Sequence, residues 1–276
     1  MCVPADAPPI TLFGLGETRS ETLISFDNAN PTPKPVGTPS QPCATNAKAA
    51  VTGTSGSATV TVNAGAFQAR NLTIANSYME GTYAGTNQAA VAINVRGDKT
   101  AFEDVALLGN QDTLLVGASN PASLIRAYFK NCLVQGDDDF IFGPGIAVFS
   151  HSIIRYDARR TGGDFGRYIF APSTLPGSAN GFLAIDSVFD LIGDIADNAV
   201  YLGRAWDQSV PDLAHYVNGT SPNGQVTIRN SLLGAHIRKQ APWSMSTVKR
   251  PYCSADCAYA SNRFYEYANT GPGSAD

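Results

Sequence analysis

The sequence predicts an all-β protein wound as a parallel β-helix, and two observations carry this prediction. A short motif of apolar residues around one Asn, Asp or His recurs along the chain, while helical periodicity is nearly absent. The composition agrees, with 15% charged residues, 43% hydrophobic residues and 26 glycines in 276 residues. Such values are typical of a β-rich globular protein and argue against disorder.

The recurring motif has a constant core and a variable spacing. Its polar residue falls at positions 20 to 44 residues apart, within the segments ARNLTI (69–74), FEDVAL (102–107), FKNCLV (129–134), FSHSII (149–154), AIDSVF (184–189) and TIRNSLL (227–233). Strands that repeat while the loops between them differ in length are expected of a β-helix. The polar residues should then lie at bends, where their side chains bond nearby backbone. A β-sandwich is the alternative, but it would show tighter hairpin signals such as Asn-Gly.

The chain is expected to form one domain over residues 1–276, with three long surface loops. The first strand-like segment is Ile10 to Gly16, after a Pro-rich lead of nine residues. The surface loops are residues 30–58, 157–166 and 209–224, which are rich in residues typical of turns. Long loops in a compact fold are commonly functional.

Charge and cysteine content limit the function classes. The net charge of −4 disfavours nucleic acid, which favours a basic partner. No apolar run is long enough to span a membrane, and no phosphate-binding Gly-Lys loop, His-Glu zinc helix or Gly-x-Ser-x-Gly motif occurs. Of five cysteines, Cys253 and Cys257 could close a short disulfide loop, whereas Cys132 is interpreted as a buried free thiol.

Two carboxylates within polar clusters mark the candidate site. Asp112 follows Gln111, and Asp139 ends a run of three aspartates that starts at Asp137. Asp112 and Asp139 are 27 residues apart, close to one coil of a β-helix, and stacked strands lie about 4.8 Å apart. Two neighbouring carboxyl groups do not ionise together easily, so one keeps its proton. The pair could therefore supply a nucleophile and an acid.

Four motifs around these residues resemble those of pectin methylesterases, in the same order. GNQDTLL is similar to the family's GYQDTLY, DFIFG matches its DFIFG, NQAAVA resembles its HQAVAL, and LGRAW resembles its LGRPW. The resemblance implies a right-handed parallel β-helix and a carboxylic ester hydrolase that demethylates methyl-esterified galacturonan and releases methanol. The chain departs from the pattern at Asn110, where the family usually has an aromatic residue, and in an insertion that includes Tyr78 to Tyr83.

The resemblance also implies residue roles. Asp139 is the expected nucleophile, and Asp112 the acid that protonates methanol and then the base for water. Gln88 and Gln111 are the expected amide donors to the oxyanion, and the Arg204 guanidinium is expected to hold Asp139. Trp206 and Thr54 are the expected substrate contacts. No cofactor or metal is expected. The expected partner is pectin or an oligogalacturonide, bound by a secreted or extracytoplasmic monomer.

The same resemblance indicates a departure at the N-terminus. In the family, the first strand-like segment is preceded by an α-helix and an early strand that cap the β-helix. Neither is visible in this sequence. We therefore expect the chain to lack its N-terminal cap and to expose its first coil.

Other interpretations remain open. Paired carboxylates also serve glycosidases, and the three-Asp run could bind Ca²⁺ as in a lyase. A catalytically inactive carbohydrate-binding β-helix, or one acting on another ester, would carry the same pattern. Taken singly, Gln88 or Gln111 could form a structural amide ladder, Trp206 could belong to the core, and Asp137 and Asp138 could be turn caps or solvent-facing.

Overall fold

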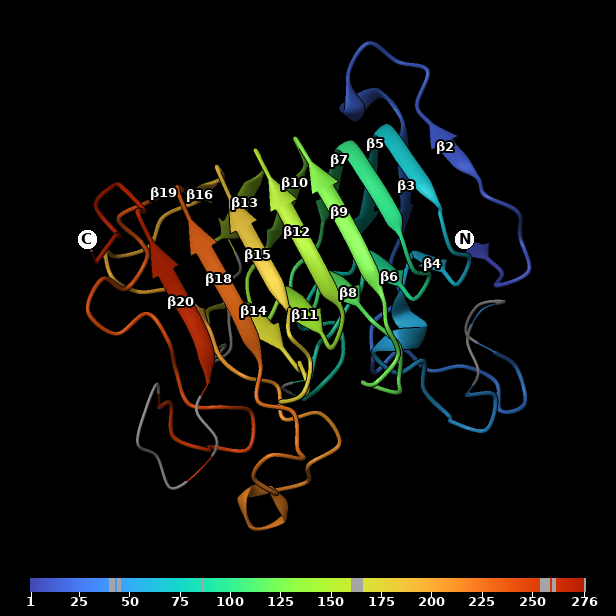
Figure 1. The fold of residues 1–276 in the computed structure, drawn as a ribbon. Helices are drawn as coiled ribbons and strands as arrows, with labels where there is room; N and C mark the ends of the chain where they lie inside the picture. Colours follow the sequence, from blue (N-terminus) through green and yellow to red (C-terminus); the bar gives the residue numbers. More distant parts are fainter. Residues whose placement is uncertain are drawn as a thin grey trace.

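Two parallel sheets run the length of the described chain and wind around a common core, as a computed structural model of the protein shows. The structure describes residues 1–39, 43, 46–85, 87–159, 166–253, 259 and 262–275. Every pairing between two named strands in this part of the chain is parallel. The strands stack in chain order between the two termini, which lie at opposite ends of the stack (Figure 1).

Successive coils contribute one short strand to the first sheet and a bent pair to the second. The seven-stranded sheet contains β1 (Cys2–Val3), β4 (Val60–Val62), β6 (Ile93–Val95), β8 (Leu114–Val116), β11 (Ile141–Gly143), β14 (Tyr168–Pro172) and β17 (Tyr201–Gly203). The thirteen-stranded sheet contains β2 (Thr11–Phe13), β3 (Leu23–Phe26), β5 (Gln68–Asn76), β7 (Thr100–Leu108), β9 (Arg126–Lys130), β10 (Leu133–Gly136), β12 (Ile146–Ser150), β13 (Ile153–Asp157), β15 (Phe182–Ile185), β16 (Val188–Ile192), β18 (Gln225–Arg229), β19 (Leu232–Leu233) and β20 (Arg263–Tyr267).

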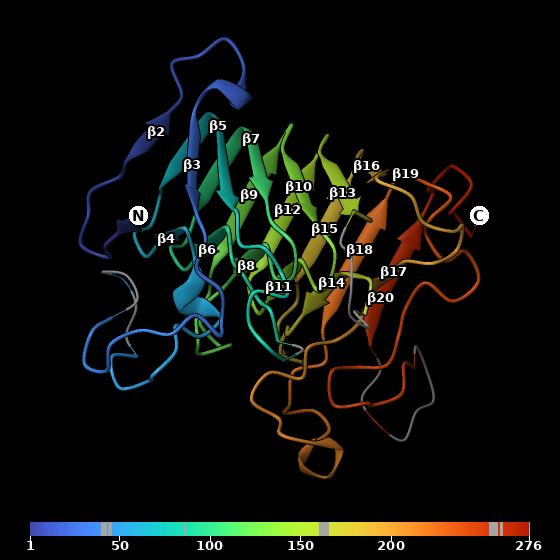
Figure 2. The same ribbon diagram turned by 180° about the vertical axis from the view of Figure 1, so that it is seen from behind.

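The helices of the described chain are short and lie in the connections between strands. The described chain contains three 3-10 helices, η1 (Arg19–Glu21), η2 (Ser55–Ser57) and η3 (Leu213–His215). None of the helices in the described ranges has the length and apolarity needed to cross a membrane. The described residues of the predicted surface loops 30–58 and 209–224 contain no strand, and both loops extend from the same edge of the stack (Figure 2). Most of the third predicted loop, 157–166, lies outside the described residues.

The predicted bends are confirmed at all six motif positions. Their polar residues have positive φ angles between 51° and 56°, at Asn71, Asp104, Asn131, His151, Asp186 and Asn230. The left-handed region is unfavourable for most residues, but Asn and Asp tolerate it because their side chains bond locally. Asn71, for example, donates Nδ2 to the carbonyls of Gly14 and Gly16 in the preceding coil at 3.1 and 2.7 Å. A seventh bend follows β20 at Ala268, with φ 50°.

A ladder of side-chain oxygens runs along the residues that follow these bends. The backbone N–H of each member donates to the side-chain oxygen of the next at 3.1 Å, through Cys132, Ser152, Ser187, Ser231 and Asn269. These side chains are buried, so each would carry an energetic penalty without a partner. The ladder therefore fixes the stacking of coils at the bend.

Aromatic stacking fills the interior in register with the strands. Phe102, Phe129 and Phe149 are direct partners on β7, β9 and β12. Their ring centroids are 4.7 and 4.8 Å apart and their planes nearly parallel. All three are fully buried, and burying a Phe side chain contributes roughly 1.5–3 kcal/mol. This column aligns the coils on which the candidate site is built.

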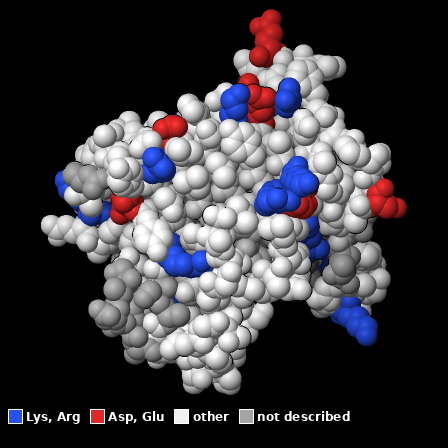
Figure 3. All heavy atoms as spheres, viewed as in Figure 1, with Lys and Arg blue, Asp and Glu red and all other residues white. Residues whose placement is uncertain are grey.

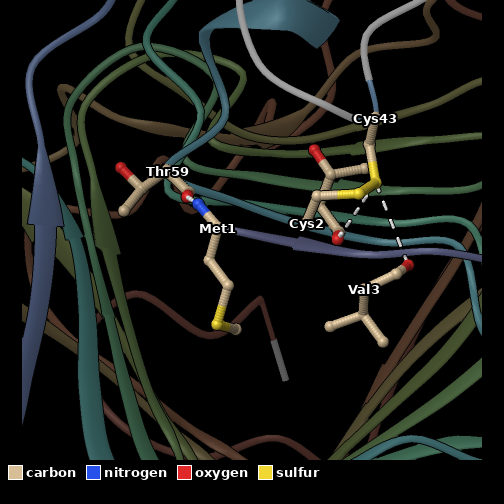
Figure 4. Close-up of a disulfide and its surroundings, with 6 residues drawn as sticks. Met1, Cys2, Val3, Cys43 and Thr59 are labelled. Atoms are coloured by element: carbon tan, nitrogen blue, oxygen red, sulfur yellow. Dashed lines mark hydrogen bonds between the residues drawn. A yellow bond between two sulfur atoms is a disulfide. The ribbon is translucent and has the colours of Figure 1, made fainter. Parts of the chain in front are cut away.

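The N-terminal lead is tied to the fold by a strand and a disulfide. The expectation that the first strand begins at Ile10 is wrong, because β1 pairs with β4 within the lead. A Cys2–Cys43 disulfide joins the lead to the first surface loop, and the Met1 amino group donates to the carbonyl of Thr59 (Figure 4). No short spacing signals this pairing, since the two cysteines are 41 residues apart.

The other cysteines agree with the sequence where they are described. Cys132 is a buried free thiol, as predicted. Burial raises its pKa to about 12, so it stays protonated. Cys253 is disulfide-bonded, and its expected partner Cys257 lies outside the described residues.

Charged side chains are sparse on the face seen in Figure 3, where basic and acidic groups lie next to each other. The ion pairs of the thirteen-stranded sheet include Lys130–Glu103 at 2.8 Å and Arg70–Glu103 at 3.3 Å. Such exposed pairs contribute little to stability. This face carries no broad basic surface of the kind that nucleic acid would favour.

Candidate active site

Adjacent coils bring Asp112 and Asp139 side by side, as the 27-residue spacing predicts. Both aspartates lie two residues before equivalent positions of β8 and β11, where Leu114 pairs with Ile141. The N–H of Asp112 donates to the carbonyl of Asp138 at 3.0 Å, which fixes the register. Both carboxylates line one cavity of about 430 Å³.

Both aspartates have left-handed backbone conformations. The φ angle is 65° at Asp112 and 45° at Asp139. Such conformations cost on the order of 1–3 kcal/mol and persist when the surroundings enforce them. Each residue lies in the bend two residues before a strand of the seven-stranded sheet, and each lines the cavity.

Arg204 binds both oxygens of the Asp139 carboxylate through one edge of its guanidinium. Its Nε donates to Oδ1 at 3.0 Å, and its Nη2 donates to Oδ2 at 2.6 Å. Both side chains are largely buried, with 22% and 12% exposure. Burial alone would lower the pKa of Arg204, but the charge and hydrogen bonds of Asp139 outweigh it and raise that pKa. The pair holds Asp139 in one orientation with its oxygens at the cavity.

Asp112 has the opposite electrostatic environment. Burial, followed by the charges of Asp139 and Asp138, raises its pKa well above the ordinary carboxyl value, and the charge of Arg204 opposes this only in part. Asp112 therefore holds a proton at a pH where an exposed carboxyl has lost it. One carboxylate is bound to a guanidinium and its neighbour has a raised pKa, and such a pair can supply a nucleophile and an acid.

The two glutamines differ in what their side chains do. Gln111 lines the cavity, and its Oε1 accepts the backbone N–H of Gln88 at 2.8 Å, which leaves its NH₂ group as the donor end. Gln88 is 1% exposed, and its Nε2 donates to the carbonyls of Tyr83 and Gly85 at 3.1 and 2.8 Å. Its Oε1 accepts the hydroxyl of Tyr78 at 2.5 Å. Gln88 thus joins the loop after β5 to Gln111.

Trp206 and Thr54 both line the same cavity as the two aspartates, and their substrate contacts stay a prediction. Trp206 is half-buried and packs on Phe142 of β11, with ring centroids 5.7 Å apart. Thr54 comes from a distant part of the sequence, where it precedes η2 near the end of the first surface loop. An indole with one free side beside two carboxylates is suited to a sugar ring.

The chain matches a known family over most of its length. The sequence model described as Pectinesterase matches residues 41–211. A pectinesterase of Ralstonia nicotianae is 56% identical over 276 residues, which are all of this chain and 69% of the relative. The chain belongs to the pectinesterase family.

Solved structures agree with this assignment. The rice weevil pectin methyl esterase has a TM-score of 0.83 and 31% identity, and the match covers 99% of this chain and 79% of that one. Escherichia coli YbhC has a TM-score of 0.80 and 29% identity over 99% of this chain and 74% of that one. The predicted right-handed parallel β-helix and carboxylic ester hydrolase are therefore confirmed.

Sequence reasoning missed part of this pectinesterase cavity. Ser55, Asn87, Phe142, Ala171 and Thr247 also line it. Thr247 comes from a segment without any motif and is placed by hydrogen bonds, since its N–H donates to the carbonyl of Ala205 at 3.0 Å. The solvent-facing alternative for Asp137 and Asp138 is wrong, because they are only 1% and 5% exposed. Within the described ranges, no group of three or more His, Cys, Asp or Glu could hold a metal ion.

Proposed function

We propose that this pectinesterase removes methyl groups from methyl-esterified galacturonan, with Asp139 as the nucleophile and Asp112 as the acid and base. The observation that carries the proposal is the pairing of the two aspartates in one cavity, one bound by Arg204 and the other with a raised pKa. No other pair of groups in the described cavity divides charge and proton in this way.

In the first step, an Asp139 oxygen forms a bond to the ester carbonyl carbon. The carbonyl oxygen becomes an oxyanion, for which the amide of Gln111 is the candidate donor. When the oxyanion collapses, the bond to methoxide breaks and the proton of Asp112 passes to it, so methanol leaves. The product is a mixed anhydride between Asp139 and the uronate.

In the second step, water cleaves this anhydride. Asp112, now ionised, takes a proton from water while the water oxygen bonds to the uronate carbonyl carbon. The Asp139 carboxylate leaves, and Asp112 is protonated again. Arg204 binds the carboxylate form of Asp139, so it favours both the attack and the departure of this group.

Gln88 was predicted as a second oxyanion donor, and this role stays a prediction. Both Nε2 contacts of Gln88 go to loop carbonyls. Its backbone contact to Gln111 supports a role in holding that amide in place instead.

The site of action follows from the substrate. A polymer of the cell wall is met outside the cytoplasm, and the Cys2–Cys43 disulfide fits an oxidising compartment. We infer that the enzyme acts there as a monomer. Light scattering of the purified protein tests the oligomeric state.

Methanol release from methylated pectin tests the proposed function. The wild-type protein should release methanol from pectin and be far slower on an aryl acetate. Asp139→Ala should abolish release while polymer binding remains, and a variant that kept its activity would remove Asp139 as the nucleophile. Methanol release that is lost on adding a chelator would favour the Ca²⁺ alternative.

A further inference from the structure

We propose that Arg250 positions one wall of the catalytic cavity, the one that the paired aspartates line, through a buried ion pair with Asp207. This wall consists of Trp206 and Thr247, which belong to different segments of the chain. Arg250 is not among the described residues that line the cavity. The proposal rests on the proposed function, because it takes this cavity to be the place where the methylated polymer binds.

The ion pair between Arg250 and Asp207 has a defined geometry. The Nη2 of Arg250 donates to Asp207 Oδ1 at 2.7 Å, and its Nε donates to Oδ2 at 3.3 Å. The two side chains are 1% and 0% exposed. Removing two charges from water costs free energy that their attraction can fail to return, so a buried pair is weak evidence for stability. Its more specific effect is orientation, because a planar guanidinium that binds both oxygens fixes the carboxylate.

Asp207 transmits this orientation to both residues of the wall. It directly follows Trp206, and its backbone N–H donates to Thr247 Oγ1 at 3.2 Å. The N–H of Thr247 donates in return to the carbonyl of Ala205 at 3.0 Å. These two hydrogen bonds tie the residues on either side of Trp206 to the segment of Thr247. The indole is therefore carried by a backbone that is fixed before and after it.

The segment of Thr247 is closed into a turn by Arg250 itself. The backbone N–H of Arg250 donates to Ser246 Oγ at 3.0 Å, and the N–H of Ser246 donates to the Arg250 carbonyl at 2.9 Å. Lys249 completes the turn with a left-handed φ of 64°. Thr247 lies within this turn, so a displacement of Arg250 would move its side chain at the cavity.

Arg250 also binds the C-terminal part of the fold. Its Nη1 donates to Oδ1 of Asn262, directly before β20, at 2.9 Å, and the Nδ2 of Asn262 donates to the carbonyl of Asn223 at 3.1 Å. Its Cζ lies 4.4 Å from the ring centroid of Tyr216, in the surface loop 209–224. A lysine would supply the charge but not this combination, which uses the edge, the end and the face of a planar guanidinium. Arg250 thus joins the last coil and this loop to the cavity wall.

Two variants separate a positioning role from a structural one. Arg250→Lys keeps the charge without the planar geometry, and the double variant Asp207→Leu, Arg250→Met replaces the ion pair by apolar side chains, which buried sites often tolerate. In both, KM for a methyl-esterified galacturonate hexamer should rise roughly fivefold to tenfold, the effect of losing one ring contact. The kcat should change little, because the Trp206 ring binds substrate and transition state alike.

The fluorescence of Trp206 reports its position without any measurement of activity. The chain has two tryptophans, so Trp243→Phe leaves Trp206 as the only indole. In this background both Arg250 variants should shift the emission to longer wavelength and increase its quenching by acrylamide, because a displaced ring is more open to water. The control is Arg155→Lys, in the ion pair of β13 and β16 that Arg155 forms with Asp190 at 2.6 Å. It should keep the wild-type KM and emission.

A lowered melting temperature with unchanged KM and unchanged emission would overturn the proposal, because Arg250 would then be purely structural. If Arg250→Lys does not fold, the double variant decides by the same two measurements. Affinity for the methylated hexamer, measured by calorimetry in an Asp139→Asn background, should fall by the factor by which KM rises. If the wild type released no methanol the proposed function would fail, whereas unchanged hexamer affinity and emission would contradict the role of Arg250 alone.

Discussion

The guanidinium of Arg204 lies over the ring of Tyr168, with Cζ 4.0 Å from the ring centroid, while the same group binds Asp139. The Tyr168 ring in turn contacts the Tyr201 ring at a tilt of 33°, with centroids 5.2 Å apart, and Arg238 lies over the Tyr201 ring at 4.2 Å. Asp139, the proposed nucleophile, is thus bound at one end of a column in which two tyrosine rings lie between two guanidinium groups. The column is set by register, because Tyr168 and Tyr201 are direct partners on β14 and β17.

Tyr168 should act as a positioning residue for Arg204. A desolvated cation–π contact contributes about 2 kcal/mol, so Tyr168→Leu should lower kcat roughly tenfold or more. KM should change little, since the ring does not line the catalytic cavity. Tyr168→Phe keeps the ring and should stay close to the wild type.

The control for Tyr168 is Tyr265→Leu, which removes an exposed ring of β20 outside the column. Steady-state methanol release gives kcat and KM for all four proteins. Equal losses in Tyr168→Phe and Tyr168→Leu would show that the hydroxyl, and not the ring, is important.

Replacing Gln111 and Gln88 by Ala should have different effects on rate and stability. Loss of an oxyanion donor typically costs about 10² to 10³ in kcat, and this is expected for Gln111→Ala with little change in stability. Gln88→Ala removes buried hydrogen bonds to the loop and should lower the free energy of unfolding by roughly 1–3 kcal/mol as well as the rate. Activity assays and urea unfolding check both, and a stable, inactive Gln88→Ala would support its predicted role as a donor.

Asp112 should make stability depend on pH. Its pKa is raised in the folded state by burial and by Asp139 and Asp138. A raised carboxyl pKa contributes stability that is fully present below the unfolded pKa of about 3.9 and is lost as pH rises through the folded value. Asp112→Asn, which mimics the protonated form, should therefore be more stable than the wild type near neutral pH, and this gain should disappear toward pH 4.

Thermal unfolding across this pH range measures the difference. Asp194→Asn, a change at an exposed carboxyl outside the cavity, is the control and should show no such trend. The catalytic counterpart is a loss of kcat at high pH, where the acid form of Asp112 disappears. A stability gain that is constant with pH would be inconsistent with a raised Asp112 pKa.

Ala268 should limit the stability of the final bend. Its φ of 50° matches that of Asn230 in the preceding coil, but Ala has no side chain that can bond locally. A left-handed conformation costs a non-glycine residue roughly 1–2 kcal/mol, so Ala268→Asn should raise the free energy of unfolding by about 1 kcal/mol. The reverse change at the matched bend, Asn230→Ala, should lower it by a similar amount.

Removing the Cys2–Cys43 disulfide should destabilise the N-terminal end. Closing a loop of 41 residues corresponds to about 4 kcal/mol in the chain-entropy estimate, and measured effects are often smaller. The double variant Cys2→Ala, Cys43→Ala should melt at a lower temperature and keep kcat, because neither residue lines the catalytic cavity. An unchanged melting temperature would indicate that β1 holds this end without the bridge.

Sequence patterns predicted the bends and the paired aspartates because both depend on residue type at a fixed place in each coil. They missed the seventh bend because Ala268 carries no polar side chain, and the disulfide because its cysteines have no characteristic spacing. Thr247 was missed since hydrogen bonds from a distant segment place it. The contacts of Gln88 were missed for a similar reason, as Tyr83 lies in the insertion and Gly85 follows it, both outside the motif.

The varying interval between the bends has a consequence for how such enzymes can change. The Ser and Phe ladders join residues at equivalent places in neighbouring coils, whatever number of residues lies between them. An insertion such as 78–83 can therefore enlarge the outer walls without shifting either aspartate. The lengths of the loops and the places of the two aspartates are thus set by different residues of each coil, so one can diverge while the other is kept.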